Sequence, residues 1–241
     1  MSDDDMPVLS ADTLSILQSF YKEQQEQQSK LQNFQEYSEN LIKSSKSSNR
    51  ENLDQNGPEN DEDEKPEGMK FFNEDWQLSQ FWYDIKTCVR LCGFAQDSVS
   101  RGKMVVFVSC PTAFVKFTET WPEYKNVRLL EYDSRFSVYK EKFIKYDYNH
   151  PTEIPHLDNV GIVFLDPPFL NEDTLNKSMT TVQLLASKPE ARIVLITGAI
   201  MLEVAANHGL HESNFYPTHS SKINNTFYCY TNFQTKKLKW V

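Results

Sequence analysis

The chain is short of glycine. Only seven of its 241 residues are glycine, and no two of them are separated by a single residue, so the sequence contains no Gly-x-Gly. Many α/β proteins hold the pyrophosphate of a dinucleotide in a glycine-rich loop that leads into a helix N-terminus. Without that loop a pyrophosphate would be held poorly, which disfavours NAD and similar cofactors.

Long apolar runs are also missing. No stretch approaches the roughly 18 consecutive apolar residues that a membrane-spanning helix needs. The N-terminus, Met-Ser-Asp-Asp-Asp, lacks the basic and apolar parts of a secretory signal peptide. We therefore expect no membrane partner.

Cysteine is scarce, and its pattern argues against two roles. Cys88, Cys92, Cys110 and Cys229 form no Cys-x-x-Cys pair and stand within apolar stretches. This is typical of reduced core residues in an intracellular protein rather than of a disulfide framework. The five histidines supply no companion spacing, so no metal ligand is expected.

Positive charge is in deficit, with 25 Lys and Arg against 34 Asp and Glu and a net charge of −9. Proteins that bind nucleic acid by neutralising phosphates carry basic surfaces. The acidic balance therefore disfavours nucleic acid and suits a basic protein partner.

The length allows one domain of about 200 residues with an appendage, and composition divides the chain into three parts. Residues 1–42 form an N-terminal extension, in which a helical pattern over residues 10–37 begins at a Ser10 cap. Residues 43–68 are rich in Ser and Asn and then acidic, which predicts a disordered linker. Residues 69–241 are expected to form the globular domain. One side of the N-terminal helix carries Leu14, Leu17, Phe20 and Tyr21.

Strands and helices alternate within the globular part. Short apolar runs indicate strands at residues 104–109, 127–132, 143–148, 160–165 and 192–197, with a final pair at 215–216 and 226–233. Helical spacing between them indicates helices that begin at caps such as Ser79 and Asn171. The pattern predicts an α/β fold with a doubly wound, mainly parallel sheet and a C-terminal antiparallel hairpin.

The run from Val160 to Phe169 carries the main functional signal. Six mostly apolar residues indicate a strand buried on both faces, and Pro167 and Pro168 must end it. Asp166 is thereby held at the carboxyl end of the strand, where open α/β sheets bind ligands. The Asp166 carboxylate, the Pro167 carbonyl and the Phe169 ring could orient an amine and stabilise its developing charge. These three are the candidate catalytic residues; alternatively, Asp166 only caps the next helix.

The ends of the preceding strands supply candidate cofactor-binding residues. Around Ser109 and Pro111 the side chains are small enough for close approach, and the missing phosphate loop favours S-adenosylmethionine, which has no phosphate, over NAD. Glu131 is suited to accept hydrogen bonds from both ribose hydroxyls, with Tyr132 or Asp133 beside the adenine. The alternative is a solvated strand end.

Two further segments could contact such a cofactor. Asp147 could accept a hydrogen bond from the adenine amino group, or it could be only a turn residue. The segment 73–83, which contains Trp76 and Gln80, is dense in aromatic residues and could cover the cofactor. Its aromatic residues could equally belong to the core.

Several motifs resemble those of one enzyme family. They are Asp-Trp-Gln-Leu-Ser-Gln-Phe-Trp-Tyr (75–83), Val-Ser-Cys-Pro-Thr (108–112), Glu-Tyr-Asp-Ser-Arg-Phe (131–136), Tyr-Asp-Tyr-Asn (146–149), Asp-Pro-Pro-Phe-Leu (166–170) and Thr-Gly-Ala-Ile-Met (197–201). Together they cover about residues 69–233. The chain resembles the lysine methyltransferases of translation elongation factor 1-alpha, once filed as adenine-amino methyltransferases. The resemblance implies a class I, seven-stranded, S-adenosylmethionine-dependent enzyme with a cytoplasmic protein substrate. We expect a cytoplasmic monomer.

Two other functions remain open. The tetrapeptide at residues 166–169 also serves enzymes that methylate adenine amino groups in nucleic acid, although the acidic balance and the lack of basic residues near Asp166 oppose this. A non-catalytic, methyltransferase-like binding module would keep the fold and lose the cofactor corner. The presence of Asp166 and Glu131 argues against it.

Overall fold

The structure is a computed structural model that describes residues 11–47, 64–221 and 225–241. The predicted Ser10 cap and residues 48–63 of the predicted linker lie outside these ranges. In chain order the elements are α1 (Ala11–Ser47), η1 (Glu67–Phe71), η2 (Trp76–Leu78), α2 (Ile85–Ser100), β1 (Met104–Val108), α3 (Pro111–Thr120), β2 (Val127–Glu131), η3 (Ser134–Lys142), β3 (Phe143–Lys145), β4 (Val160–Leu165), α4 (Glu172–Leu185), β5 (Arg192–Gly198), η4 (Ala199–Met201), α5 (Leu202–Asn207), β6 (His211–Glu212) and β7 (Phe227–Thr231), where η denotes a 3₁₀ helix.

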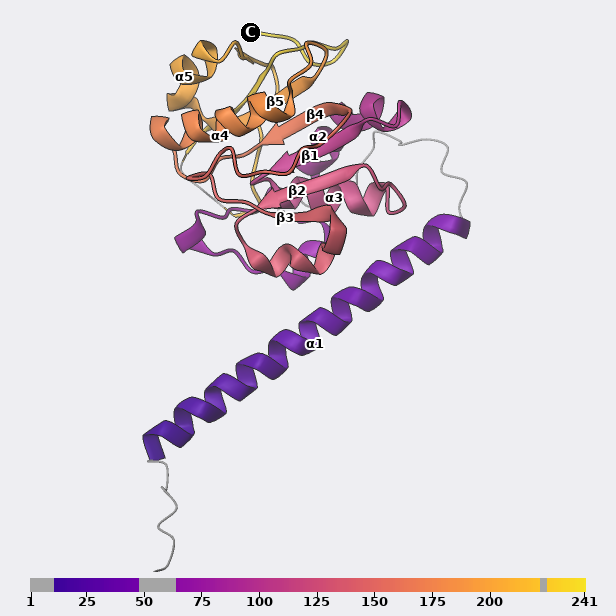
Figure 1. Cartoon of the computed structure of the whole chain (residues 1–241). Coiled ribbons are helices and arrows are strands. Elements are labelled where there is room, and N and C mark those ends of the chain that lie inside the picture. The colour runs from indigo at the N-terminus through magenta and orange to yellow at the C-terminus, as the bar shows by residue number, and fades with distance from the viewer. Residues whose placement is uncertain (1–10, 48–63, 222–224) are drawn as a thin grey trace, which may run out of the picture.

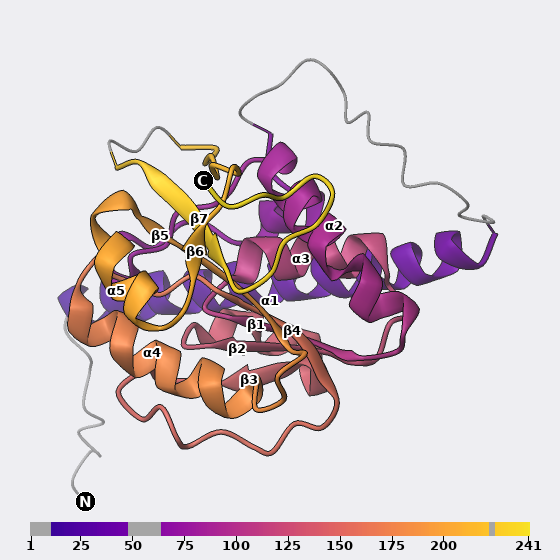
Figure 2. The same ribbon diagram turned by 90° about the horizontal axis from the view of Figure 1, so that it is seen from above.

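A single seven-stranded sheet with the order β3-β2-β1-β4-β5-β7-β6 forms the centre of the protein. The strands β1 to β5 run parallel, and β7 is antiparallel to both β5 and β6. Helices α2 and α3 cover one face and α4 and α5 the other (Figures 1 and 2). The predicted doubly wound sheet with a C-terminal antiparallel pair is confirmed. The direction of winding reverses between β1 and β4, and ligands bind at such a point.

Strand β4 shows how closely the sheet is packed on both faces. Every residue from Val160 to Leu165 is buried, as the sequence predicts. Alternate side chains enter the two hydrophobic cores, with Ile162 and Phe164 on one face and Val163 and Leu165 on the other. The Phe164 ring stacks on that of Phe107 in β1, with centroids 4.8 Å apart. All four cysteines are buried and form no disulfide.

Several predicted elements have other bounds in the structure; the strand expected at residues 143–148, for example, ends at Lys145. Helix α2 begins at Ile85 and is capped by Asp84, whose side chain accepts a hydrogen bond from the Thr87 N–H; the prediction of a Ser79 cap was wrong. Ser79 has a φ of 55° and ends η2 instead. Residues 80–84, between η2 and α2, are therefore not helical.

The last hairpin is also built differently. Residues 215–216 are not a strand, and His211–Glu212 pairs with β7 in their place. The Phe215 side chain packs edge-on against Phe94 of α2, with ring centroids 5.7 Å apart. The apolar Phe215 therefore signals a contact with the core and not a strand of the sheet.

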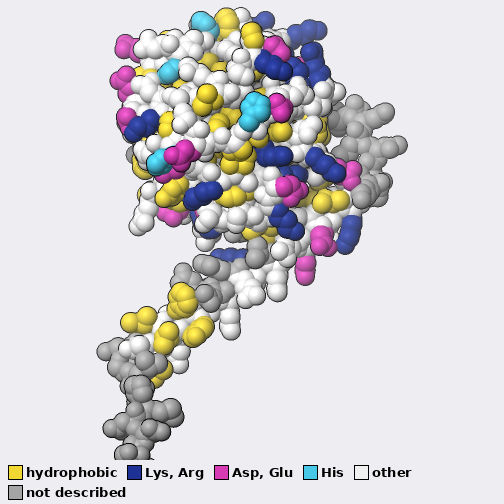
Figure 3. Space-filling view, in the orientation of Figure 1, with side chains coloured by type: hydrophobic (Ala, Val, Ile, Leu, Met, Phe, Trp, Pro, Cys, Tyr) yellow, Lys and Arg dark blue, Asp and Glu magenta, His cyan; other side chains and the backbone are white. Residues whose placement is uncertain are grey.

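Helix α1 runs to Ser47, beyond the predicted helix end at residue 37 and five residues into the predicted linker. Leu14, Phe20 and Tyr21 are exposed near its N-terminal end, where Figure 3 shows a group of hydrophobic side chains. No helix in the described ranges is long and apolar enough to cross a membrane.

Aromatic packing and one buried carboxylate hold the C-terminal half of α1 against the domain. The Phe34 side chain is only 4% exposed, and its ring lies 5.0 to 5.8 Å from those of Phe71, Phe72 and Tyr139. The Tyr37 hydroxyl donates to Glu119 Oε1 of α3 at 2.9 Å. Helix α1 is thus anchored at Phe34 and Tyr37, within its C-terminal half and before its last residue, Ser47.

The same carboxylate fixes the start of the packed domain. The Gly68 N–H donates to Glu119 Oε1 at 2.7 Å. A Cβ atom on Gly68 would lie 2.8 Å from Val115 Cγ1, so only glycine allows this close approach. The packed part of the chain therefore includes Gly68, immediately before the expected boundary at Met69.

Phe34→Ala should loosen α1 without unfolding the sheet. Removing the ring deletes contacts with three aromatic residues, and we expect a loss of about 3–5 kcal/mol of docking free energy. Hydrogen exchange of the α1 amides should accelerate while the sheet amides stay protected. Phe20→Ala, an exposed aromatic residue on the same helix, is the matched control. Unchanged exchange in Phe34→Ala would contradict the anchoring.

Candidate active site

A cavity of about 270 Å³ lies at the carboxyl ends of the parallel strands. Its size is near the lower end of the roughly 300–1,000 Å³ of small-molecule sites. The lining residues are Gln77, Leu78, Ser79, Gln80, Phe81, Trp82, Ser109, Pro111, Thr112, Glu131, Tyr132, Tyr146, Asp147, Tyr148, Asn149, Asp166, Pro167, Pro168 and Phe169. Nine of the eleven predicted site residues are therefore brought together; Trp76 and Asp133 do not line the cavity.

The turn between β1 and α3 is tight although it contains no glycine. Ser109 has a φ of 49°, in the left-handed region that glycine usually occupies. Its N–H donates to the Leu130 carbonyl at 2.8 Å, which ties the turn to β2. Pro111 follows at the start of α3, where a missing N–H costs nothing. The turn thus gives a ligand close access to the backbone without a phosphate-binding loop.

Glu131 is a buried acceptor at the end of β2. Its side chain is 6% exposed, and Oε1 accepts a hydrogen bond from the Asp133 N–H at 2.9 Å. Burial raises the pKa of Glu131 to about 7, and the nearby Asp133 charge adds to this rise. A ligand that donates hydrogen bonds would offset part of the cost of this buried carboxylate.

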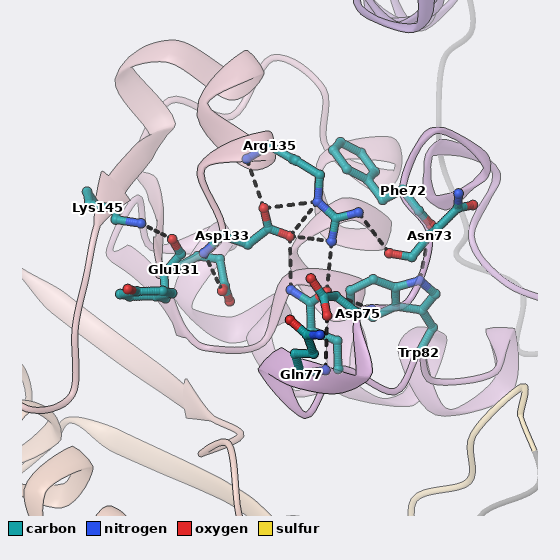
Figure 4. A network of polar contacts seen from close by, with 11 residues as sticks. Phe72, Asn73, Asp75, Gln77, Trp82, Glu131, Asp133, Arg135 and Lys145 are labelled. Carbon is teal, nitrogen blue, oxygen red and sulfur yellow. Dashed lines mark hydrogen bonds and ion pairs between the residues drawn. The ribbon is translucent and has the colours of Figure 1, made fainter. Parts of the chain in front are cut away.

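The Asp133 carboxylate takes part in a hydrogen-bond network with neighbouring side chains (Figure 4). Its carboxylate accepts hydrogen bonds from Arg135 Nε at 2.8 and 3.0 Å and from Gln80 Nε2 at 3.0 Å. Although burial acts to raise it, these bonds hold the pKa of Asp133 below its ordinary value. Asp133 therefore fixes Gln80 in the cavity wall rather than facing the cavity. Nearby, Trp76 is 75% exposed, with its ring 6.0 Å from Phe81.

Asp166 lies where β4 ends. Its N–H donates to the Val108 carbonyl at 3.1 Å, and its Oδ2 accepts a hydrogen bond from the Tyr83 hydroxyl. Burial raises the pKa of Asp166 to about 7; the Tyr83 hydrogen bond opposes this rise and the Glu131 charge adds to it. No group in the described ranges donates to the carbonyl of Pro167, which is thus available to a ligand.

Phe169 presents an aromatic face at the mouth of the cavity. Its side chain is 43% exposed and its φ is 63°, a conformation that costs a bulky residue about 1–2 kcal/mol. Such strain concentrates at functional sites. The backbone turn that places the ring at the cavity is thus maintained against a local cost.

The cavity wall is acidic. Glu131, Asp147 and Asp166 line it, and no Lys, Arg or His is among the lining residues in the described part of the chain. Asp147 Oδ1 also accepts a hydrogen bond from the Asn149 N–H at 2.9 Å, so it is both a turn residue and a wall residue. An acidic wall of this kind suits a cationic ligand and opposes a phosphate.

Sequence reasoning missed Tyr83, whose hydroxyl contacts the main candidate residue from outside the cavity lining. It also missed Thr112, Tyr146, Tyr148 and Asn149 in the wall. The sequence feature that could have indicated Tyr83 was the high aromatic content of segment 73–83. Predicting a helix from Ser79 onward concealed it.

A doubly wound seven-stranded sheet, an Asp-Pro-Pro-Phe turn after β4 and an acidic cavity at the switch point together define a class I methyltransferase. Comparison with known proteins agrees. Residues 74–235 match the family described as probable N6-adenine methyltransferase. Proteins named EEF1A lysine methyltransferase 1 are similar over nearly the full chain. Identity is 39% in Gallus gallus, covering 96% of each chain, and 37% in Mus musculus, covering 97% of this chain and 95% of the relative.

The Homo sapiens protein of that name is 35% identical, covering 98% of this chain and 96% of its own. A Saccharomyces cerevisiae protein-lysine N-methyltransferase is 34% identical over 76% of this chain and 83% of its own. The chain belongs to the methyltransferase family that includes these protein-lysine methyltransferases, and it is an enzyme that requires a methyl donor.

Glu131→Gln should stabilise the ligand-free protein by an amount that grows as the pH rises from 4.5 to above 7. The pKa of Glu131 is about 7 when folded, against an ordinary 4.5. The favourable contribution of the protonated form is therefore present below pH 4.5 and is lost as the pH rises through 7. Thermal denaturation at pH 8 should show the variant more stable by about 3 kcal/mol, with little difference at pH 4.5. An equal gain at both values would point to packing instead.

Proposed function

We propose that the cavity binds S-adenosyl-L-methionine and that the enzyme transfers its methyl group to a lysine ε-amine of translation elongation factor 1-alpha. The observation that carries the proposal is the Asp166–Pro167 corner, which offers two acceptors in a wall without basic residues. The names of the full-length relatives support the same substrate.

The hydrogen-bond acceptors that line the cavity fit this cofactor. Glu131 would accept hydrogen bonds from the ribose hydroxyls, and Asp147 from the adenine amino group. Ser109 and Pro111 would let the cofactor approach the backbone closely. The cofactor supplies an electrophilic methyl group on a positively charged sulfonium, which the acidic wall would favour. No phosphate-binding loop is needed.

The rim would complete the cofactor site. Gln80, held by Asp133 and Arg135, would close one side of the site. The exposed Trp76 and Tyr132 lie nearby, and either ring could cover the adenine. A positioning role through Gln80 thus replaces the direct adenine contact first considered for Asp133.

The amine would be aimed by Asp166 and Pro167. A lysine with a pKa of about 10.4 is protonated at neutral pH and must lose a proton before it has a lone pair. This proton can leave to solvent before transfer, so Asp166 needs only to accept a hydrogen bond from the neutral amine. The Phe169 ring would stabilise the methylammonium that forms. Two fixed acceptors and one ring would leave the lone pair directed at the methyl group.

A protein substrate fits better than nucleic acid. The description of the matched family names adenine methylation. However, the net charge is −9 and the cavity wall has no cation among its described residues, which opposes a phosphate backbone. The presence of Asp166 and Glu131 likewise argues against a purely binding module. A cytoplasmic, monomeric enzyme is consistent with the proposed substrate.

Asp166→Ala should abolish most methyl transfer while leaving the cofactor site intact. The loss of one preorganised polar contact predicts a fall of about 100-fold or more. Transfer of a tritiated methyl group should be measured on elongation factor 1-alpha and, in parallel, on DNA and RNA. Near-wild-type activity would reject the role of Asp166. Labelling of nucleic acid alone would favour the adenine-amino alternative.

Glu131→Ala should weaken cofactor binding. Calorimetry with S-adenosyl-L-methionine should show a loss of about 1.5–3 kcal/mol, the scale of hydrogen bonds to a charged acceptor. Glu141→Ala, an exposed carboxylate in η3, is the control and should bind normally. If Glu131→Ala binds with wild-type affinity, the ribose contact lies elsewhere.

A further inference from the structure

Tyr83 is the buried side chain that stands directly behind Asp166. It is 1% exposed, it lies between η2 and α2, and its hydroxyl donates to Asp166 Oδ2. It does not line the cavity. Oδ1 of Asp166 has no hydrogen-bond donor in the described part of the chain, so the two carboxylate oxygens have different surroundings.

The backbone around Tyr83 is fixed by a distant segment of the chain. The Asp84 N–H donates to the Thr218 carbonyl at 3.2 Å, and the Ser220 N–H donates to the Trp82 carbonyl at 2.8 Å. Between these bonds Tyr83 pairs with His219 in an antiparallel bridge. Tyr83 therefore has little freedom to move away from Asp166.

The side chain of Tyr83 is held as well. The His219 ring lies 4.8 Å from the Tyr83 ring and 4.7 Å from the Phe227 ring, measured between centroids. Burial lowers the pKa of His219 to about 4, against the charges of Asp84 and Glu74, so the ring is neutral at neutral pH. His219 thus packs against Tyr83 as an uncharged aromatic ring.

We propose that Tyr83 is a positioning residue for the transfer reaction: its hydroxyl fixes Oδ2 of Asp166, favours the ionised carboxylate and leaves Oδ1 to accept the substrate amine. This role rests on the proposed function of Asp166 as the amine acceptor. Tyr83 itself touches neither the cofactor site nor the amine.

The other groups near the pair do not supply this stabilisation. The titratable groups that face it are Cys110 and Glu131 near Asp166, Cys88 and Cys110 near Tyr83, and His219 against the Tyr83 ring. Burial raises the pKa of both thiols, so they stay neutral, and the charge of Glu131 disfavours a second anion. No Lys or Arg in the described ranges forms an ion pair or hydrogen bond with Asp166 or Tyr83. The Tyr83 hydroxyl is the contact that opposes protonation of Asp166.

The test is Tyr83→Phe in the full-length enzyme. Loss of the donor disfavours the ionised carboxylate, so the acid limb of the pH profile of kcat/KM should move up by about one pH unit. At pH 7 the ionised fraction of Asp166, and with it the methyl-transfer rate, should fall about fivefold, with unchanged affinity for S-adenosyl-L-methionine. Tyr124→Phe, which deletes the hydrogen bond from that hydroxyl to the Lys103 carbonyl, is the matched control and should leave the profile unchanged.

Two further measurements separate positioning from a merely structural role. In an Asp166→Asn background, Tyr83→Phe should have no further effect on the pH profile, since no carboxylate is left to titrate. In ¹³C NMR of the cofactor-free enzyme, the Asp166 carboxyl signal should titrate near pH 7 and about one unit higher in Tyr83→Phe. If Tyr83→Phe does not fold, the wild-type Tyr83 phenol signal still reports the contact. It should shift with the titration of Asp166 and lose that shift in Asp166→Asn.

An unmoved acid limb and an unmoved carboxyl titration in Tyr83→Phe would overturn the inference, as would a wild-type phenol signal insensitive to Asp166. A wild-type enzyme that transfers no methyl to lysine would reject the proposed function instead. The carboxyl titration would then still decide whether Tyr83 controls Asp166.

Discussion

The withdrawal of water from Glu131 and Asp166 is the constraint on which the site depends. Both carboxyl groups stand at the ends of buried parallel strands, where the surrounding protein favours their uncharged forms. Ser109 and Phe169 add backbone conformations that side chains other than glycine rarely adopt. Two hydrophobic cores, one on each face of the sheet, keep these unfavourable features in place. The packing of the two cores thus compensates for the unfavourable burial and backbone strain at the candidate active site.

The walls of the cavity come from parts of the chain that are far apart in sequence. Tyr83 meets Asp166 across 83 positions, and Ser220 and Ser221 bind the segment before α2 across 138 and 147 positions. The site therefore forms only when both ends of the domain have reached the sheet. Long-range pairing of this kind makes the site a late product of folding.

The sequence predicted the elements whose local signals agreed with their tertiary setting. Strand β4 has the expected bounds because its apolar run ends at a double proline, and α4 begins after the Asn171 cap because its side chain accepts a hydrogen bond from the Thr174 N–H. The start of α2 was misplaced because the aromatic spacing around Phe81 matched a helix, whereas these side chains serve the cavity wall and the core. The Gln80–Asp133 and Tyr83–Asp166 contacts could not be predicted, since each joins residues more than 50 positions apart.

Helix α1 is held to the domain at Phe34 and Tyr37, and its N-terminal part projects from this clamp. From Ala11 to Phe34 it extends about 35 Å, so a tilt of about 5° at the clamp moves the free end by about 3 Å. Figures 1 and 2 both show this free end on the side of the sheet where β1 and β4 end. Small changes in the packing of three aromatic rings are thereby magnified at a distance, on the same side of the domain as the cavity. Geometrically, the clamp determines where the apolar end of the helix can reach.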